Sequence, residues 1–147
     1  MFTDAPKRIL CIHDLSGAGR SSLAVVTPVL AVMGHQPVML PTALLSTHTG
    51  GFTGFTYRDL TGDILPMARH WKSLGCRFQA LYTGFLGSEA QIGLVEEMFD
   101  WFGGEDTLIL VDPVMGDGGK LYQTYIQAAP EYRLDKRSLD NYYVASS

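Results

Sequence analysis

The chain has 147 residues, of which 46% are hydrophobic, and its 11 Lys and Arg against 15 Asp and Glu leave a formal net charge of -4. This composition excludes a disordered chain and indicates a globular domain with its own core, while the small negative charge argues against a nucleic-acid partner. Cys11 and Cys76 are too few for a disulfide framework or a metal knuckle, and no stretch resembles a signal peptide or a membrane span. We therefore expect a cytoplasmic protein with reduced thiols.

The first half of the chain alternates short apolar runs with a helical pattern. Residues 8–12 and 37–41 are predicted strands, and apolar residues at helical spacing predict a helix over 21–33 that ends at Gly34. Pro28 either kinks this helix, which we favour, or begins a second one. Residues 42–57 are rich in Gly, Thr and Ser without a period, so we expect a loop there.

The second half continues the alternation. A helix capped by Thr61 or Asp63 is expected to end at Gly75 and to bury Ile64, Met67, Ala68, Trp71 and Leu74. A strand over 78–83 follows, and then a helix over 88–102 whose capping box pairs Ser88 with Gln91. The unbroken apolar run 107–111 predicts a strand covered on both faces. Residues 123–147 show no clear period and are predicted to form one weak helix or a mobile tail.

This element order predicts an α/β fold with a parallel central sheet flanked by helices on both sides, in three layers. We expect residues 1–122 to form the domain, with 123–147 as a tail. Ligands of such sheets bind beyond the carboxyl ends of the strands. All four predicted strands end in polar or glycine residues: Asp14, Gly17 and Gly19; Ser46, His48, Thr49 and Gly50; Thr83 and Gly84; Asp112, Gly116, Asp117, Gly118, Gly119 and Lys120.

Single motifs at these strand ends have weaker meanings. The Gly17–Gly19 turn lacks the third glycine of a dinucleotide fingerprint, because Ser22 stands there, and a plain tight turn is the simpler interpretation. Leu121 after Lys120 excludes a Walker phosphate loop. Asp112 and Asp117 either flank a magnesium-nucleotide complex or only cap turns. The convergence of several strand ends is therefore the stronger signal.

Four segments in this order resemble the pyridoxal (pyridoxamine) kinases of the ribokinase-like superfamily: IHDLSGAGRSSL, LPTALLSTHTGGF, YTGFLGSE and VDPVMGDGGKLY. The resemblance runs from about Lys7 to Tyr122, and hydroxymethylpyrimidine kinases share part of the pattern. It implies the ribokinase-like, Rossmann-like three-layer fold. It also implies ATP-dependent phosphorylation of the 5'-hydroxymethyl group of pyridoxal, pyridoxamine or pyridoxine, in salvage of pyridoxal 5'-phosphate.

The resemblance also assigns residues. Asp14 and Thr49 would hydrogen-bond the polar edge of the pyridine ring, Gly19 would allow close backbone approach, and Phe85 would offer an apolar contact. The implied vitamer-binding residues are Asp14, Gly19, His48, Thr49, Thr83, Gly84 and Phe85. Asp112 and Asp117 would face ATP and its Mg²⁺, and a monovalent cation is a further implication of the resemblance. Positioning and charge neutralisation are what phosphoryl transfer needs.

The family's catalytic aspartate lies in a Gly-x-Gly-Asp loop, and no such sequence occurs in this chain. We therefore name no catalytic residue and expect the N-terminal half of a truncated kinase, with little or no turnover. A truncation, a reading frame altered after Tyr122 and a piece of a longer chain all remain open. The last predicted strand would then lack later neighbours, so we expect self-association, with a homodimer the family's implied state. A non-catalytic vitamer-binding module and a hydroxymethylpyrimidine kinase are the alternatives.

Overall fold

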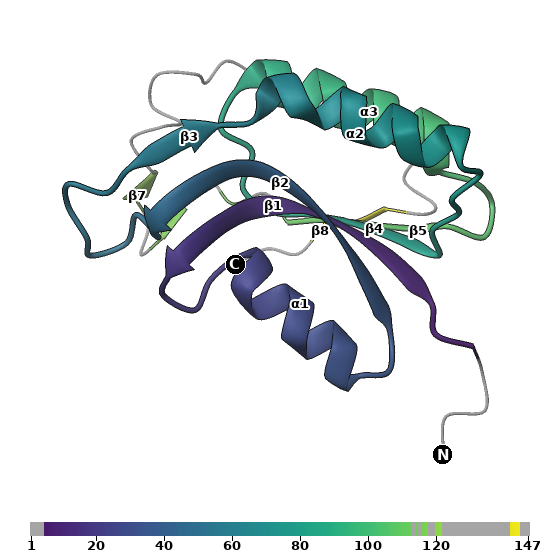
Figure 1. Ribbon diagram of the computed structural model, residues 1–147, viewed down its shortest axis with the longest axis horizontal. Helices are drawn as coiled ribbons and strands as arrows, with labels where there is room; N and C mark the ends of the chain where they lie inside the picture. The colour runs from purple at the N-terminus through teal and green to yellow at the C-terminus, as the bar shows by residue number, and fades with distance from the viewer. Residues whose placement is uncertain (1–4, 113, 115, 118–119, 122–141, 145–147) are drawn as a thin grey trace.

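The computed structural model describes residues 5–112, 114, 116–117, 120–121 and 142–144. The elements follow the order β1 (Arg8–Ala18), α1 (Leu23–Val32), β2 (Gln36–Thr47), β3 (Tyr57–Asp59), α2 (Thr61–Ser73), β4 (Ala80–Thr83), α3 (Glu89–Phe102), β5 (Leu108–Val111), β6 (Gly116–Asp117), β7 (Lys120–Leu121) and β8 (Tyr142–Val144). Figure 1 shows β1 and β2 as long curved strands between α1 on one side and α2 with α3 on the other. The predicted α/β architecture is confirmed.

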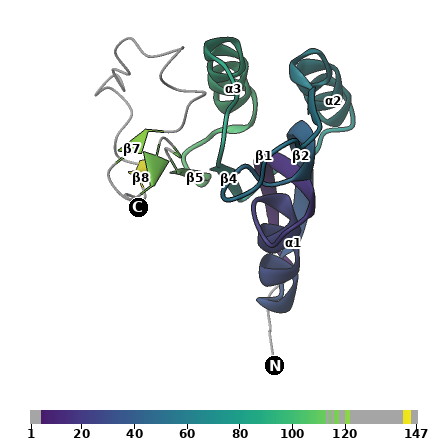
Figure 2. The same ribbon diagram turned by 90° about the vertical axis from the view of Figure 1, so that its left-hand side faces the viewer.

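One sheet has the strand order β3-β2-β1-β4-β5-β8, and β6 pairs with β7 in a separate two-stranded ladder. The strands β2, β1, β4, β5 and β8 are parallel to their neighbours, whereas β3 runs antiparallel at the edge of β2. The chain passes from β1 to β2 through α1, on one face, and from β2 to β4 through α2, on the opposite face (Figure 2). The direction of connection therefore reverses between β1 and β4, and ligands of open parallel sheets bind at such a switch point.

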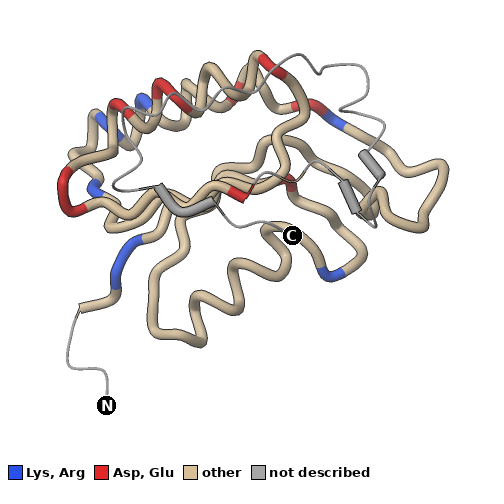
Figure 3. Tube along the Cα trace, turned by 180° about the vertical axis from the view of Figure 1, so that it is seen from behind, with Lys and Arg blue, Asp and Glu red and all other residues tan. Residues whose placement is uncertain are grey.

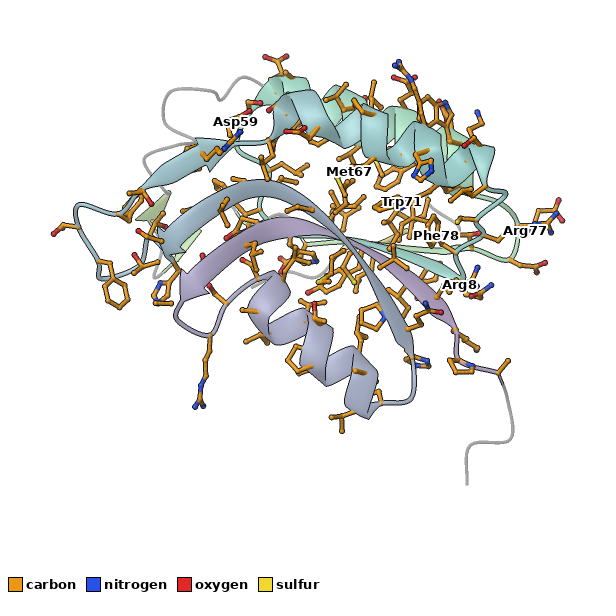
Figure 4. All side chains as sticks on the ribbon, in the orientation of Figure 1. Arg8, Asp59, Met67, Trp71, Arg77 and Phe78 are labelled. Atoms are coloured by element: carbon orange, nitrogen blue, oxygen red, sulfur yellow. The ribbon has the colours of Figure 1, made fainter. Side chains whose placement is uncertain are left out.

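The core lies between the sheet and the pair α2 and α3. Strand residues Leu10, Ile12, Leu40 and Leu81 meet helix residues of this pair, which include Ile64, Ala68, Val95, Met98 and Phe102. Figure 4 shows Met67, Trp71 and Phe78 in the layer between α2 and the sheet. The ring of Phe78 packs edge-on against Phe102, with 5.0 Å between ring centroids. Burial of these side chains fixes the sheet to α2 and α3.

The predicted helices exist, with differences at their ends. Pro28 lies inside the single helix α1, as favoured, and Gly34 and Gly75 follow α1 and α2 with positive φ values of 85° and 68°. The predicted cap of α2 is wrong: neither Thr61 nor Asp63 caps it, and the Asp59 carboxylate instead accepts a hydrogen bond from the Thr61 N–H at 2.8 Å. Leu74 is 63% exposed, because α2 has already ended at Ser73.

The predicted loop 42–57 is wrong at both ends. Strand β2 continues to Thr47 and β3 begins at Tyr57, while β1 runs on to Ala18 in register with Thr47. Gly17 thus lies within β1 rather than in a tight turn. Pairing with β1 satisfies the backbone hydrogen bonds of residues 42–47, whose side chains show no alternation of apolar and polar residues.

The last predicted strand also differs from expectation. Strand β5 pairs on its outer side with β8, where Val111 is in register with Val144. It is therefore not an unpaired edge strand, and the reason given for expecting self-association is wrong. Its two faces are unequal: Ile109 is buried, with its side chain near Gly103 after α3, whereas Leu108 is 43% exposed, since α1 packs against β1 and β2. The rest of the predicted tail lies outside the described residues.

Within the described residues, no helix combines the length and apolar character needed to cross a membrane. Figure 3 shows Lys and Arg spread over several elements of the described trace, with acidic residues along α2 and α3.

Candidate functional site

Asp14 lies at an irregularity between β1 and β2. The paired register passes from His13 opposite Pro41 to Leu15 opposite Leu44, so two residues of β2 face Asp14 alone. Such bulges are common beside functional sites because they redirect a side chain. The Asp14 side chain is only 6% exposed. A carboxylate is therefore buried in the second half of β1, next to the switch point of the sheet.

Two serine hydroxyls hold this carboxylate. The Ser22 Oγ donates to Asp14 Oδ1 at 2.5 Å, and the Ser16 Oγ donates to Asp14 Oδ2 at 3.2 Å. Each carboxylate oxygen can accept a further hydrogen bond, since an ionised carboxylate has about four acceptor positions. Among the described residues no Lys or Arg pairs with Asp14, so neutral donors alone stabilise it. This arrangement suits a ligand that brings a hydrogen-bond donor or a positive charge.

Gly84 follows β4 on the other side of the switch point. Its N–H donates to the Ile12 carbonyl at 2.9 Å, which continues the β1–β4 ladder by one residue. A Cβ at Gly84 would overlap the His13 ring, so no other residue fits without a shift. Thr83 is buried in register with Ile12 and Val111. Thr83 and Gly84 therefore place the end of β4 beside Ile12 and His13, the two residues that precede Asp14.

His13 is a buried group that the sequence analysis did not assign to the site. Its ring packs edge-on against Tyr82 with 4.4 Å between centroids, and its Nε2 has no hydrogen-bond partner among the described residues. Burial lowers the pKa of His13 to about 4, although a hydrogen bond with the Tyr82 backbone opposes this shift. His13 is therefore neutral near pH 7, and its ring packs against the backbone of Gly84.

The segment after β2 approaches β1 through His48. A Cβ at Gly19, where φ is 102°, would overlap the His48 ring, so glycine permits both the backbone conformation and this contact. His48 also packs edge-on against Phe52 at 4.9 Å between centroids. Thr49 is exposed. The structure thus brings Gly19 and His48 together and leaves Thr49 on the surface beside them.

The segment after β4 is fixed by a side chain that the sequence analysis treated only as part of a cap. Gln91 is 0% exposed, and its Nε2 donates to the Thr42 carbonyl and the Thr61 hydroxyl, both at 3.0 Å. Its Oε1 accepts from the Gly87 N–H at 2.8 Å. The Ser88 hydroxyl accepts from the Gln91 N–H as expected, but the reciprocal bond reaches Gly87 rather than Ser88. Gln91 therefore joins β2, α2 and the 84–88 segment.

Phe85 and Tyr57 lie in this region as well. Phe85 is half-buried, and its carbonyl accepts from the Thr42 hydroxyl at 3.2 Å. The Tyr57 hydroxyl reaches the same segment, since a Cβ on Gly87 would lie 2.6 Å from it. Burial, with the charges of Asp59 and Asp14, raises the pKa of Tyr57. The sequence analysis did not assign Tyr57 to the site, because it expected a loop at this position, where the structure has the edge strand β3.

Asp112 follows β5 at the same edge of the sheet. Its N–H donates to the Thr83 carbonyl at 3.1 Å, and its side chain is half-buried. Burial raises the pKa of this carboxyl. Asp117 lies in β6, and its side chain is outside the described residues. Within the described part, no three His, Cys, Asp or Glu residues converge on a possible metal position.

A hollow of about 440 Å³ lies at the opposite edge of the sheet, before β4 and β5. Its lining includes Arg77, Gln79, Trp101 and Asp106, and none of the predicted site residues belongs to it. The predicted residues lie instead toward the carboxyl edge, where Asp14 is in the second half of β1 and Gly84 and Asp112 follow the adjacent strands β4 and β5.

Comparison with known proteins identifies relatives only among solved structures, since no family model and no curated protein sequence matches the chain. A protein from Bacteroides thetaiotaomicron described as a candidate phosphomethylpyrimidine kinase is 46% identical over 85% of this chain and 43% of its own, with a TM-score of 0.80. Another crystal form of it, with pyridoxal, is 48% identical over 80% of this chain and 41% of its own, with a TM-score of 0.77.

Two further structures have the same fold. Pyridoxal kinase from Lactobacillus plantarum is 35% identical over 82% of this chain and 43% of its own, with a TM-score of 0.75. Pyridoxal kinase from Leishmania donovani, in complex with ADP and pyridoxamine, is 22% identical over 78% of this chain and 43% of its own, with a TM-score of 0.68, which is a likeness of fold. The chain thus spans about two fifths of the length of the structures it matches.

Proposed function

Because this chain fits the ribokinase-like pyridoxal kinase family, we propose that it serves the ATP-dependent phosphorylation of the 5'-hydroxymethyl group of pyridoxal, pyridoxamine or pyridoxine. The observation that carries the proposal is the buried Asp14 carboxylate, held by two hydroxyls beside Gly84 at the switch point. It offers a fixed acceptor to the polar edge of a pyridine ring. The product would supply pyridoxal 5'-phosphate salvage in the cytoplasm.

The other residues of the carboxyl edge have complementary roles in this proposal. Gly19 and Gly84 allow the ring to approach the backbone, and Phe85 gives an apolar contact to its face. His48 and Thr49 close the side next to Gly19, with Thr49 donating to the polar edge of the ring. Thr83 belongs to the wall between the ring and the nucleotide. These side chains bind and orient the vitamer, and orientation is a large part of catalysis in phosphoryl transfer.

We assign the nucleotide side of the site to Asp112, with Asp117 as its expected partner. A Mg²⁺ ion is usually held by one or two carboxylates together with substrate phosphates, so a single half-buried carboxylate beyond β5 fits such an ion. The burial that raises the pKa of Asp112 also favours a cationic partner for its ionised form. When bound, Mg²⁺ would neutralise charge on the phosphates. A monovalent cation and a homodimer are further expectations of the family.

Calorimetry with pyridoxine tests the vitamer site, and pyridoxine has no aldehyde that could react with lysine. We expect saturable binding by the wild-type chain and at least roughly tenfold weaker binding by Asp14→Asn, because the amide replaces a charged acceptor. Asp100→Asn, on the exposed face of α3, is the control and should bind normally. Equal affinity of Asp14→Asn and wild type would remove Asp14 from the site.

Nucleotide binding is tested separately with Mg²⁺-ATP. Asp112→Ala should weaken Mg²⁺-ATP binding and leave the pyridoxine affinity unchanged. Asp106→Ala is the matched control. It removes an exposed carboxylate from the segment just before β5, at the end of the strand opposite to Asp112. If both variants bind Mg²⁺-ATP like the wild type, Asp112 has no role in the nucleotide site.

Hydroxymethylpyrimidine is the second candidate substrate, because the 46% identical relative is described as a candidate phosphomethylpyrimidine kinase. Competition between pyridoxine and hydroxymethylpyrimidine in the same titration decides which ring is preferred. Mass spectrometry after incubation with Mg²⁺-ATP reveals any phosphorylated vitamer. Binding of pyridoxine without any such product would favour the non-catalytic binding module.

A further inference from the structure

Ser22 breaks two local rules at once. It is the residue before α1, where a serine normally caps the helix by accepting a hydrogen bond from the backbone, yet its side chain makes no such bond. Its φ is 52°, a left-handed value that is unfavourable for a residue with a Cβ, and it is the only described non-glycine residue with positive φ. Local costs of this kind persist where another contact outweighs them, and they concentrate at functional sites.

The contact that outweighs them is the bond to Asp14. With φ at 52°, the Ser22 hydroxyl donates to Asp14 Oδ1 at 2.5 Å rather than capping α1. The Ser16 hydroxyl holds the other oxygen at 3.2 Å. Two donors on the two oxygens fix the plane of the carboxylate, and they occupy one acceptor position on each oxygen. The remaining acceptor positions are then presented to a ligand in one orientation.

We propose that Ser22 is a positioning residue of the vitamer site, whose hydroxyl orients Asp14 and makes it an acceptor for a ring that brings its own donor. The inference rests on the proposed function and adds a residue to it. Ser22 acts through Asp14, and the strain at its backbone is the local cost of this orientation. A dinucleotide fingerprint that began at Gly17 and Gly19 would have its third glycine at position 22. This chain has Ser22 there, which supplies a hydroxyl instead.

Two substitutions separate the hydroxyl from the backbone. Ser22→Ala removes the hydroxyl and keeps the strain, whereas Ser22→Gly removes the hydroxyl and relieves the strain, so the glycine variant should melt at the higher temperature. Both variants should bind pyridoxine roughly tenfold more weakly than the wild type in calorimetry. Ser21→Ala is the matched control, because the Ser21 hydroxyl is buried without a partner among the described residues, and it should keep the wild-type affinity.

A merely structural role predicts a different pattern, in which affinity follows melting temperature and Ser22→Gly binds as well as the wild type. That pattern, or wild-type affinity in both Ser22 variants, overturns the inference while the vitamer site stands. Absence of pyridoxine binding by the folded wild-type chain overturns the proposed function, and the role of Ser22 with it. Equal loss in the alanine and glycine variants, despite their different melting temperatures, supports the positioning role.

Discussion

His13 illustrates how a single buried side chain links the site to pH. The pKa of His13 is about 4 in the folded protein against 6.5 for an ordinary histidine, so the unfolded chain binds more protons between these values. Stability therefore falls as pH falls from about 6.5 toward 4, by roughly 3 kcal/mol over the full range. Urea unfolding at several pH values should show this slope in the wild type and a flatter one in His13→Gln. His70→Gln, on the exposed side of α2, should keep the wild-type slope, and an unchanged slope in His13→Gln would contradict the assignment.

The His13 ring also prevents any larger residue from replacing Gly84 without a steric clash. Because a methyl group at Gly84 would overlap the His13 ring, Gly84→Ala should lower the free energy of unfolding by about 2 kcal/mol or more. Gly93→Ala is a matched control within α3, where nothing lies within 4 Å of an added Cβ, and it should raise stability by about 0.5 to 1 kcal/mol. Chemical denaturation of the two variants measures both signs. A neutral Gly84→Ala would mean that His13 moves aside at little cost.

At the scale of elements, Gln91 connects three pieces of the fold that carry the site. Gln91→Met keeps the length of the side chain but leaves the Gly87 N–H and the Thr42 carbonyl without this partner, so we expect a loss of about 2 to 4 kcal/mol. Glu96→Met on the exposed face of the same helix should change stability by less than about 0.5 kcal/mol. Urea unfolding compares the two, and equal small effects would show that Gln91 is not the connection between β2, α2 and the 84–88 segment.

At the scale of the whole molecule, the site exists only when the elements are assembled. Asp14 comes from β1, Ser22 is the residue before α1, and Gly84 is the residue after β4, so the unfolded chain has no such site. Pyridoxine at one hundred times its dissociation constant should therefore raise the free energy of unfolding by about 2.7 kcal/mol. Thermal or chemical unfolding with and without pyridoxine measures this increase. Asp14→Asn should show a smaller increase at the same concentration, and an identical increase would place pyridoxine elsewhere.

The alternation of helices and strands, and hence the α/β fold, could be predicted from the sequence because apolar spacing and breakers such as Gly34 and Gly75 are local signals. The placement of Asp14, Gly84 and Asp112 near one edge of the sheet was also predictable, since the carboxyl ends of parallel strands share that edge. The extended pairing of β1 with β2 was not, because residues 42–47 form a strand only through their partner. A local pattern does not record such long-range pairing.

Only the tertiary structure decided which side chains support the site. Ser22 meets Asp14 across a sequence separation of eight residues, and Gln91 meets Thr42 across one of 49 residues. His13 lies beneath Gly84 because β1 and β4 are neighbours in the sheet, although the chain passes through β2 between them. Hydrogen bonding and steric fit act over a few ångströms of space, whatever the separation along the chain, whereas helical and strand periodicity act along the chain itself.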